Sequence, residues 1–337
     1  MSRFKIVLFA LILSIIGLSI ALLLVGSVDI PVSGVFNVIC GKSSNRAWEF
    51  IVLESRLPLI VTSCLSGAAL AVCGLLLQTS FNNPLADPSI LGISTGAGLG
   101  VALLLLLSGG ALYTSFGGYI AILFGALIGA FLIMMILLLF STIVKSATML
   151  LIVGVLISYL ASSAISLLNF FSTQEGVHSF VIWGLGNFSG VTTKQLPFFS
   201  IVILVGIIGA MALIKPLNAL LLGERYAENL GVNLKRTRNM LLLITGLLTA
   251  IVTAFCGPIG FIGLVVPHLA RLMLGTSDHL RLMPITILSG GTIAMICSFL
   301  SVLPYSGIIP INAITPIIGV PVIIFIVINR RKIFYFN

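Results

Sequence analysis

The sequence contains very little charge. Only 25 of its 337 residues are Asp, Glu, Lys or Arg (7%), whereas 59% are hydrophobic. A soluble domain is about a quarter charged and about half apolar, so a soluble enzyme, a nucleic-acid-binding protein and a disordered chain are all excluded. A membrane-spanning helix needs roughly 20 apolar residues. The composition therefore predicts a polytopic membrane protein with little chain left for a domain outside the bilayer.

The sequence also lacks the motifs of intramembrane enzymes and ion-coupled carriers. It has no His-Glu-x-x-His, Gly-x-Ser-x-Gly or paired-carboxylate pattern. Carriers driven by protons or sodium need ionisable groups at mid-membrane, and this chain has almost none inside its apolar runs. Asp87 lies in a turn between two prolines, where we expect a carboxylate at the N-terminus of a helix. Gly41-Lys42-Ser43 resembles the end of a phosphate-binding loop, but Phe36 stands where that motif requires glycine. We therefore expect the driving energy to come from elsewhere, and if nucleotide supplies it, a separate subunit must bind the nucleotide.

The five cysteines follow neither a metal-ligand spacing nor a disulfide framework. Four of them fall inside apolar segments, where we expect packing roles. We therefore expect no metal site, no catalytic residue and no cofactor in this chain.

Long charge-free runs predict ten transmembrane helices. Gly109-Gly110 divides the run 88–144, Gly257-Pro258 divides the run that starts at 239, and Pro304 to Pro310 divide the run 282–329. The strand alternation of a membrane barrel is absent, so every span must be a helix. We place the helices at 6–25, 58–78, 90–107, 119–140, 147–168, 196–214, 239–256, 259–274, 283–303 and 313–329.

The basic residues lie mostly on one side of these spans. If the N-terminus is cytoplasmic, thirteen of the seventeen Lys and Arg residues lie inside, and four lie outside: Lys42, Arg46, Arg56 and Lys194. The positive-inside rule favours this orientation, with both termini in the cytoplasm. The N-terminal apolar run exceeds the usual core of a signal peptide, so we expect it to remain as the first span.

Small residues recur at helical spacing. They form three rows: Gly92, Gly96 and Gly100; Gly125 and Gly129; and Ser63, Gly67, Ala68 and Ala71. Such rows let helices approach closely in lipid, where no hydrophobic force drives helices together. We interpret them as packing surfaces of a tight bundle.

The longest polar stretch on the predicted cytoplasmic side covers 215–238. Within it, 221–233 predicts a short amphipathic helix that Gly231 ends. Its apolar face is Leu222, Tyr226, Ala227 and Leu230, and its polar face is Glu224, Arg225 and Glu228. It could lie on lipid or dock to a protein. Lipid-surface helices are rich in Lys and Arg on the polar face, so this mixed charge favours a protein.

Several motifs along the chain resemble those of the FecCD family, the ABC-transporter permeases that import iron-siderophores, haem and cobalamin. The first block contains Arg56-Leu57-Pro58, Gly67-Ala68-Ala69-Leu70-Ala71, Gly74, Gln78, Asn83-Pro84-Leu85-Ala86-Asp87-Pro88, Leu91-Gly92 and Thr95-Gly96-Ala97. The second contains Gly223, Ala227, Leu230-Gly231-Val232, the run from Gly257 to His268, and Arg271. Thr315 and Gly319-Val320-Pro321 resemble the family's final span.

This resemblance implies an all-α membrane protein with the type II ABC importer permease fold. The whole chain, 1–337, would be one transmembrane domain in the bacterial cytoplasmic membrane, acting as a homodimer by alternating access. Two ATPase subunits would bind ATP and Mg and hydrolyse the ATP, and an extracytoplasmic binding protein would deliver the metal chelate. The 215–238 stretch would be the coupling segment that receives the ATPase, through Gly223, Glu224, Arg225, Ala227, Glu228, Leu230 and Gly231.

The resemblance also implies roles for other residues. Asn83, Leu85, Ser141 and Thr142 would close a cytoplasmic gate, and the fifth span would line the pathway with Ser158, Tyr159, Ser162 and Ser166. Arg56 would dock the binding protein. The family commonly has a second arginine three residues later, where this chain has Leu59. Docking could therefore use Arg56 with Lys42, Arg46 or Lys194, or apolar contact.

Two other classes stay open on the sequence. An ion-coupled secondary transporter of small solutes would need an ionisable relay, and its uptake would collapse with the ion gradient. A membrane-embedded assembly subunit would bind partners but move no cargo. The motifs do not separate iron-siderophore, haem and cobalamin as cargo.

Overall fold

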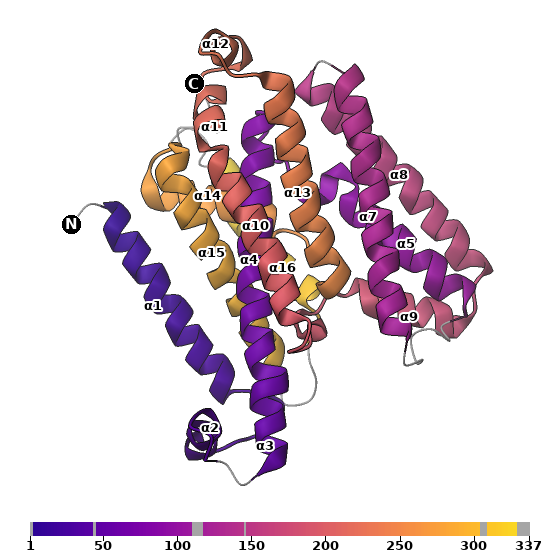
Figure 1. Cartoon of the computed structure of the whole chain (residues 1–337), viewed down its shortest axis with the longest axis vertical. Coiled ribbons are helices and arrows are strands. Elements are labelled where there is room, and N and C mark those ends of the chain that lie inside the picture. Colours follow the sequence, from indigo (N-terminus) through magenta and orange to yellow (C-terminus); the bar gives the residue numbers. More distant parts are fainter. Residues whose placement is uncertain (1–2, 43–44, 110–116, 145, 304–308, 329–337) are drawn as a thin grey trace.

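The computed structural model describes residues 3–42, 45–109, 117–144, 146–303 and 309–328. Over these residues the chain is helical, with no strand, and α12 and α2 lie at opposite ends of the bundle (Figure 1). The elements are α1 (Arg3–Leu24), α2 (Val32–Ile39), α3 (Arg46–Phe50), the π-helix η1 (Ile51–Arg56), α4 (Leu57–Ser80), the 3-10 helix η2 (Pro88–Leu91), α5 (Ile93–Leu107), α7 (Gly118–Ile143), α8 (Ala147–Phe171), α9 (Gln174–Gly184), η3 (Phe188–Gly190), α10 (Leu196–Ala212), α11 (Ile214–Leu220), α12 (Glu224–Asn229), α13 (Leu234–Cys256), α14 (Ile262–Leu274), α15 (His279–Val302) and α16 (Ile311–Ile328).

The helices match the predicted spans. Six described helices are long and apolar enough to cross a membrane: α1, the continuous helix Arg46–Ser80 that contains α4, α7, α8, α13 and α15. The helices α10 and α11 form a pair bent by 49°, and α5, α14 and α16 are shorter apolar helices. Each of the ten predicted segments coincides with one of these. Every predicted end lies within five residues of a helix end, when α4 is compared with 58–78 and α10 with 196–214. The all-α membrane fold is confirmed.

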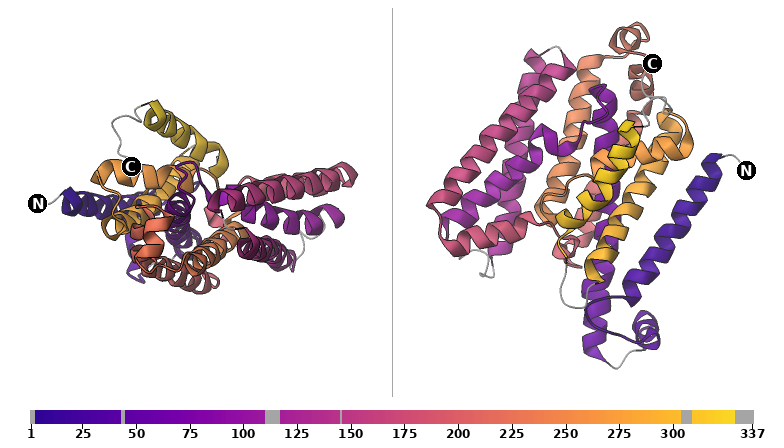
Figure 2. Two further views of the ribbon diagram at one scale, coloured as in Figure 1. Left: turned by 90° about the horizontal axis from the view of Figure 1, so that it is seen from above. Right: turned by 180° about the vertical axis from the view of Figure 1, so that it is seen from behind.

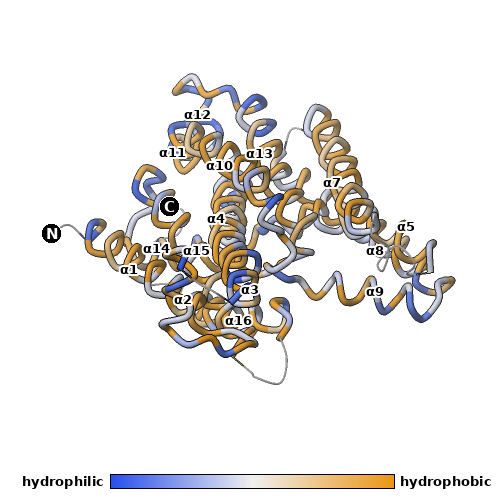
Figure 3. Tube along the Cα trace, turned by 60° about the horizontal axis from the view of Figure 1, so that its bottom comes forward, coloured by the Kyte–Doolittle hydropathy of each residue, from blue (hydrophilic) through white to orange (hydrophobic). Residues whose placement is uncertain are grey.

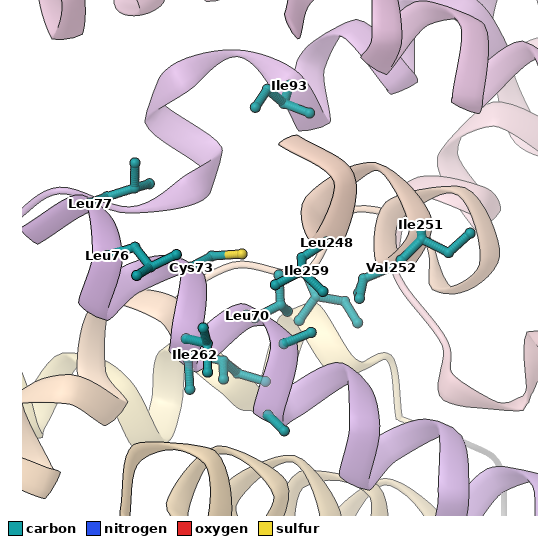
Figure 4. Packing of buried hydrophobic residues seen from close by; sticks show 14 of the residues in the cluster. Leu70, Cys73, Leu76, Leu77, Ile93, Leu248, Ile251, Val252, Ile259 and Ile262 are labelled. Carbon is teal, nitrogen blue, oxygen red and sulfur yellow. The ribbon is translucent and has the colours of Figure 1, made fainter. Parts of the chain in front are cut away.

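The helix α4 forms the centre of the bundle. In its most apolar window 72% of the residues are buried, against 6% for α1 and 17% for α8. It packs against α10, α13, α14 and α15, and Figure 4 shows Leu70 and Leu76 of α4 facing a cluster that includes Leu248 and Ile262. The helices α5, α7 and α8 form a group on one side, visible in both views of Figure 2, and this group packs against α13 through α7 and α5.

The outer surfaces of the helices are apolar. Figure 3 shows hydrophobic residues along most of their length and hydrophilic residues gathered at the α12 end and around α3. Ile128 on α7 and Ile208 on α10 are more than half exposed. A surface of this kind faces lipid acyl chains in a membrane protein, because lipid is as apolar as the side chains themselves.

Glycines bring neighbouring helices into backbone contact. A Cβ atom built on Gly100 of α5 would lie 1.9 Å from the carbonyl oxygen of Gly125 on α7, and one on Gly129 would lie 2.0 Å from that of Gly96. Gly67 of α4 meets α15 in the same way. The predicted packing through small residues is therefore confirmed. Gly92 is the exception, because its φ of +81° places it in the turn before α5 rather than on the α5 packing face.

Candidate functional site

The 215–238 segment folds into two short helices at one end of the bundle. Gly223, with a φ of +99°, separates α11 from α12, and Gly231, with a φ of +85°, follows the end of α12 (Figure 1). Positive φ angles suit glycine, which lacks a Cβ atom. The amphipathic helix predicted over 221–233 is therefore shorter than expected, because Gly223 breaks the chain before Glu224, while Gly231 ends it as predicted.

The apolar face of this segment is largely uncovered by its own chain. Leu222, Tyr226 and Leu230 are 62%, 67% and 66% exposed, whereas Ala227 is fully buried. The polar residues Glu224, Arg225 and Glu228 are exposed as well, and so is Gly231. Three large apolar side chains in the open at the hydrophilic end of the bundle are the kind of surface that marks an interaction site.

An ion pair fixes α12 to the next helix. Arg238 of α13 donates to a Glu224 carboxylate oxygen at 3.2 Å, and also to the carbonyl of Val144 at 3.4 Å in the turn between α7 and α8. Beside it, the Ser141 hydroxyl donates to the side-chain oxygen of Asn239 at 2.7 Å. The second expected gate turn is thus bonded to the start of α13, directly after the 215–238 segment.

The two second-turn residues expected in the gate differ in their surroundings. Ser141 is only 4% exposed and its hydroxyl is used by Asn239. Thr142 is exposed and donates to the carbonyl of Leu139 within its own helix, at 2.7 Å. Of the two, Thr142 is the side chain that faces outward, and Ser141 holds α7 against α13.

The first expected gate turn, 81–87, is braced from both sides. The side-chain oxygen of Asn83 accepts from the backbone N–H of Leu85 at 2.9 Å, which leaves the Leu85 side chain 51% exposed. The Pro84 carbonyl meets Nε2 of His268 on α14 at 2.7 Å. This bond and the 2% exposure of His268 show a packed, hydrogen-bonded side chain.

Asp87 ends this turn and caps η2. Its carboxylate accepts from the backbone N–H of Ser89 at 3.1 Å, as predicted for a helix N-terminal carboxylate. Burial raises the pKa of Asp87, and the hydrogen bonds from Ser89 act against that rise. The carboxylate lies against Gly263, where a Cβ atom would come within 2.6 Å of it. The turn is therefore fitted closely onto the start of α14.

One cavity connects these parts. It has a volume of about 380 Å³ and is lined by the end of α4, the start of α8 and the α11–α12 junction: Thr79, Ser80, Phe81, Asn82, Ser146, Ala147, Thr148, Leu220, Leu221, Leu222, Gly223 and Glu224. The cavity therefore lies beside the two turns that carry the expected gate residues and beside the expected coupling segment, but Asn83, Leu85, Ser141 and Thr142 do not line it.

The expected pathway residues lie elsewhere, on α8. Ser158 and Ser166 donate to the carbonyls of Gly154 and Ser162 one turn earlier, as expected for serines within a helix. Tyr159 is 69% exposed, and Ser162 and Ser166 are exposed beside it. This part of α8 therefore presents a row of hydroxyl groups on a surface that its own chain leaves open.

Arg56 occupies a different environment from the one its expected docking role requires. It is 5% exposed, and its guanidinium donates to the backbone carbonyls of Leu23, Leu24 and Val28 where α1 ends. The side chain therefore ties the start of α4 to the α1–α2 connection. In contrast, Lys42, Arg46 and Lys194 are exposed.

Several polar residues that the sequence reasoning overlooked hold the α12 end together. They are Thr79, Asn218, Arg238, Asn239 and His279, and each makes a hydrogen bond to another helix or to a connecting turn. The signal in the sequence that could have identified them is a polar side chain inside or beside an apolar run. In the part of the chain that the structure describes, no cluster of His, Cys, Asp or Glu could hold a metal ion.

Comparison with known proteins agrees with this architecture. A family model described as the FecCD transport family matches residues 8–329. The chain belongs to the FecCD transport family. It is therefore the permease subunit of a type II ABC importer, a membrane protein with multiple spans.

Individual FecCD relatives align over most of their length. The chain is 36% identical over 285 residues to the vitamin B12 import system permease protein BtuC of Citrobacter koseri, covering 84% of each chain. It is 34% identical over 309 residues to a protein of Methanocaldococcus jannaschii assigned as an ABC transporter permease, covering 90% of this chain and 88% of the relative. A solved inward-facing structure, assigned to a metal-chelate type ABC transporter, matches with a TM-score of 0.83 and 30% identity over 97% and 99% of the two chains.

Proposed function

We propose that two copies of this chain form the pathway of an ATP-driven importer for cobalamin or an iron complex, either an iron-siderophore or haem. The chain would act as one transmembrane domain, and a separate ATPase would bind and hydrolyse ATP. The B12 permease and the metal-chelate transporter named above support this cargo class. The charge distribution supports a cytoplasmic α12 end and cytoplasmic termini in a bacterial inner membrane.

The uncovered face of α12 carries the proposal. Leu222, Tyr226 and Leu230 offer an apolar contact, while the Glu224–Arg238 ion pair and buried Ala227 fix the helix to the bundle. An ATPase that bound this face would move α12, and the bonds of Arg238 to Glu224 and to the Val144 carbonyl would pass that movement to the turn between α7 and α8. Each ligand would act only through its different affinity for the outward-open and inward-open states.

The open hydroxyl row on α8 supports a pathway role. Exposed hydroxyls gain no hydrogen bonds from lipid, so Tyr159 and Ser162 fit a water-filled surface between two copies better than a lipid contact, whereas the Ser166 hydroxyl already donates to the Ser162 carbonyl within α8. For the binding protein, exposed Lys42, Arg46 and Lys194 are better placed than buried Arg56 to pair with acidic residues.

Binding of the cognate ATPase tests the role of α12. Tyrosine is enriched among the few interface residues whose truncation costs about 2 kcal/mol or more, so Tyr226→Ala should weaken ATPase binding by roughly tenfold or more. Leu243→Ala is a matched control, because Leu243 is exposed on α13 within the membrane span. Equal affinity in both variants would contradict the assignment of α12 as the ATPase contact.

A further inference from the structure

Three buried or half-buried polar residues connect α11, α15 and α4. Asn218 of α11 contacts His279, the first residue of α15, with 2.8 Å between the amide oxygen and Nδ1. The other ring nitrogen, Nε2, lies 2.9 Å from the Thr79 hydroxyl near the end of α4. Thr79 and His279 are 3% and 1% exposed. The three side chains form a continuous chain of hydrogen bonds across three helices.

The direction of each bond follows from the groups around Asn218. Its amide nitrogen donates to the Asp278 carboxylate at 2.8 Å, so its oxygen must face His279. That oxygen accepts from both the backbone N–H of His279 and Nδ1–H of the ring. In a neutral ring the remaining nitrogen is an acceptor, so the Thr79 hydroxyl donates to it. Both ring nitrogens of His279 and the amide oxygen of Asn218 thereby take part in hydrogen bonds between the three helices.

The two ends of this chain lie beside the coupling segment and the first gate turn. Asn218 is two residues before the end of α11, which leads through Gly223 into α12. Thr79 lies two residues before the turn 81–87, and its carbonyl accepts from the backbone N–H of Asn82 at 3.3 Å. We propose that Thr79, Asn218 and His279 are positioning residues that pass the movement of α11–α12 to the gate turn at Asn82–Asp87.

This inference rests on the proposed function, because it assigns a role within ATP-driven gating. A second connection, through Arg238 and Asn239, links the start of α13 to the other gate turn. The two connections share no residue, so each turn has its own link to one end of the coupling segment. A linking element must be stiff to transmit a displacement. Buried polar groups that are hydrogen-bonded to one another are stiff in this sense.

Transport per ATP hydrolysed tests the link in proteoliposomes that contain the full importer. Thr79→Val keeps the shape of the side chain but removes the donor to His279. We expect ATP hydrolysis to continue while transport per ATP falls about fivefold or more, with Thr79→Ser restoring it. Thr286→Val is the control, since Thr286 is equally buried on α15 but bonds only to its own helix, at the Leu282 carbonyl. Thr79→Val and Asn218→Leu together should be no worse than the more severe single change.

Three results would overturn the link: an unchanged ratio, parallel loss of hydrolysis and transport, or additive effects in the double variant. A measurement without cargo separates this outcome from failure of the proposed function. A spin label at Leu85→Cys, in a Cys40→Ser background that removes the exposed native thiol, reports the mobility of the gate turn directly. Asn218→Leu should change its spectrum and Thr286→Val should not. If neither variant changed the spectrum, the link through Thr79, Asn218 and His279 would be rejected. If the wild-type importer showed no ATP-driven uptake, the proposed function alone would be rejected.

Discussion

Replacing Gly100 with alanine should push two helices apart. The new Cβ atom would start 1.9 Å from the Gly125 carbonyl oxygen, while real Cβ contacts are essentially never shorter than 3.0 Å. The obstacle is backbone rather than a flexible side chain, so α5 or α7 must shift by about 1 Å. Overpacking of this kind costs about 1–3 kcal/mol. We expect a lower thermal unfolding midpoint for the purified protein in detergent.

Gly98 provides a matched control on the same helix. A Cβ atom there would meet nothing closer than 3.7 Å, an ordinary van der Waals contact. Because alanine favours a helix over glycine by about 1 kcal/mol, Gly98→Ala should leave the protein equally stable or slightly more stable. The two substitutions should therefore act in opposite directions. If Gly100→Ala were as stable as Gly98→Ala, the close contact between α5 and α7 would be wrong.

Four further substitutions test individual residues. Arg56→Leu should lower the stability of the protein by about 1–3 kcal/mol, because it leaves the Leu23, Leu24 and Val28 carbonyls without their donor. Arg46→Gln changes an exposed residue, so it should leave thermal stability unchanged and weaken the affinity for the binding protein instead. Gln78→Met should lower stability by about 2–3 kcal/mol in thermal unfolding, because fully buried Gln78 accepts a hydrogen bond from Arg271 at 2.7 Å. A variant as stable as the wild-type protein would show that this bond contributes nothing to stability. Glu224→Gln should change stability by less than about 1 kcal/mol, because the Glu224 side chain is 47% exposed. It should nevertheless lower the amount of cargo transported per ATP hydrolysed. If that amount were unchanged, the Glu224–Arg238 ion pair would have no part in coupling.

The sequence predicted the spans well because lipid imposes a simple rule. A charged residue inside the hydrocarbon is costly, so charge-free runs such as 88–144 mark helices directly. Glycines four residues apart predicted backbone contact between helices, and Gly96 and Gly100 make it with α7. Both features depend on local spacing alone, which can be read without knowing the fold.

Contacts between distant residues could not be predicted in this way. Thr79 and His279 are separated by 200 positions, and only the packing of α4 beside α15 brings them together. Arg56 shows the same difficulty for charge. Its position at the start of a helix was compatible with an exposed docking residue, but the carbonyls that bury it come from the end of α1. A sequence shows that a side chain is charged, but it does not show whether other groups of the same chain bury that side chain and hydrogen-bond to it.

ATP-driven uptake tests the central claim most directly. The chain would be reconstituted in vesicles with its cognate ATPase and binding protein, and uptake of labelled cobalamin, a ferric siderophore and haem would be measured separately. We predict uptake of one of these cargoes that requires hydrolysable ATP and persists when a protonophore collapses the proton gradient. Uptake that continues without ATP and stops with the gradient would instead show an ion-coupled carrier and contradict the account.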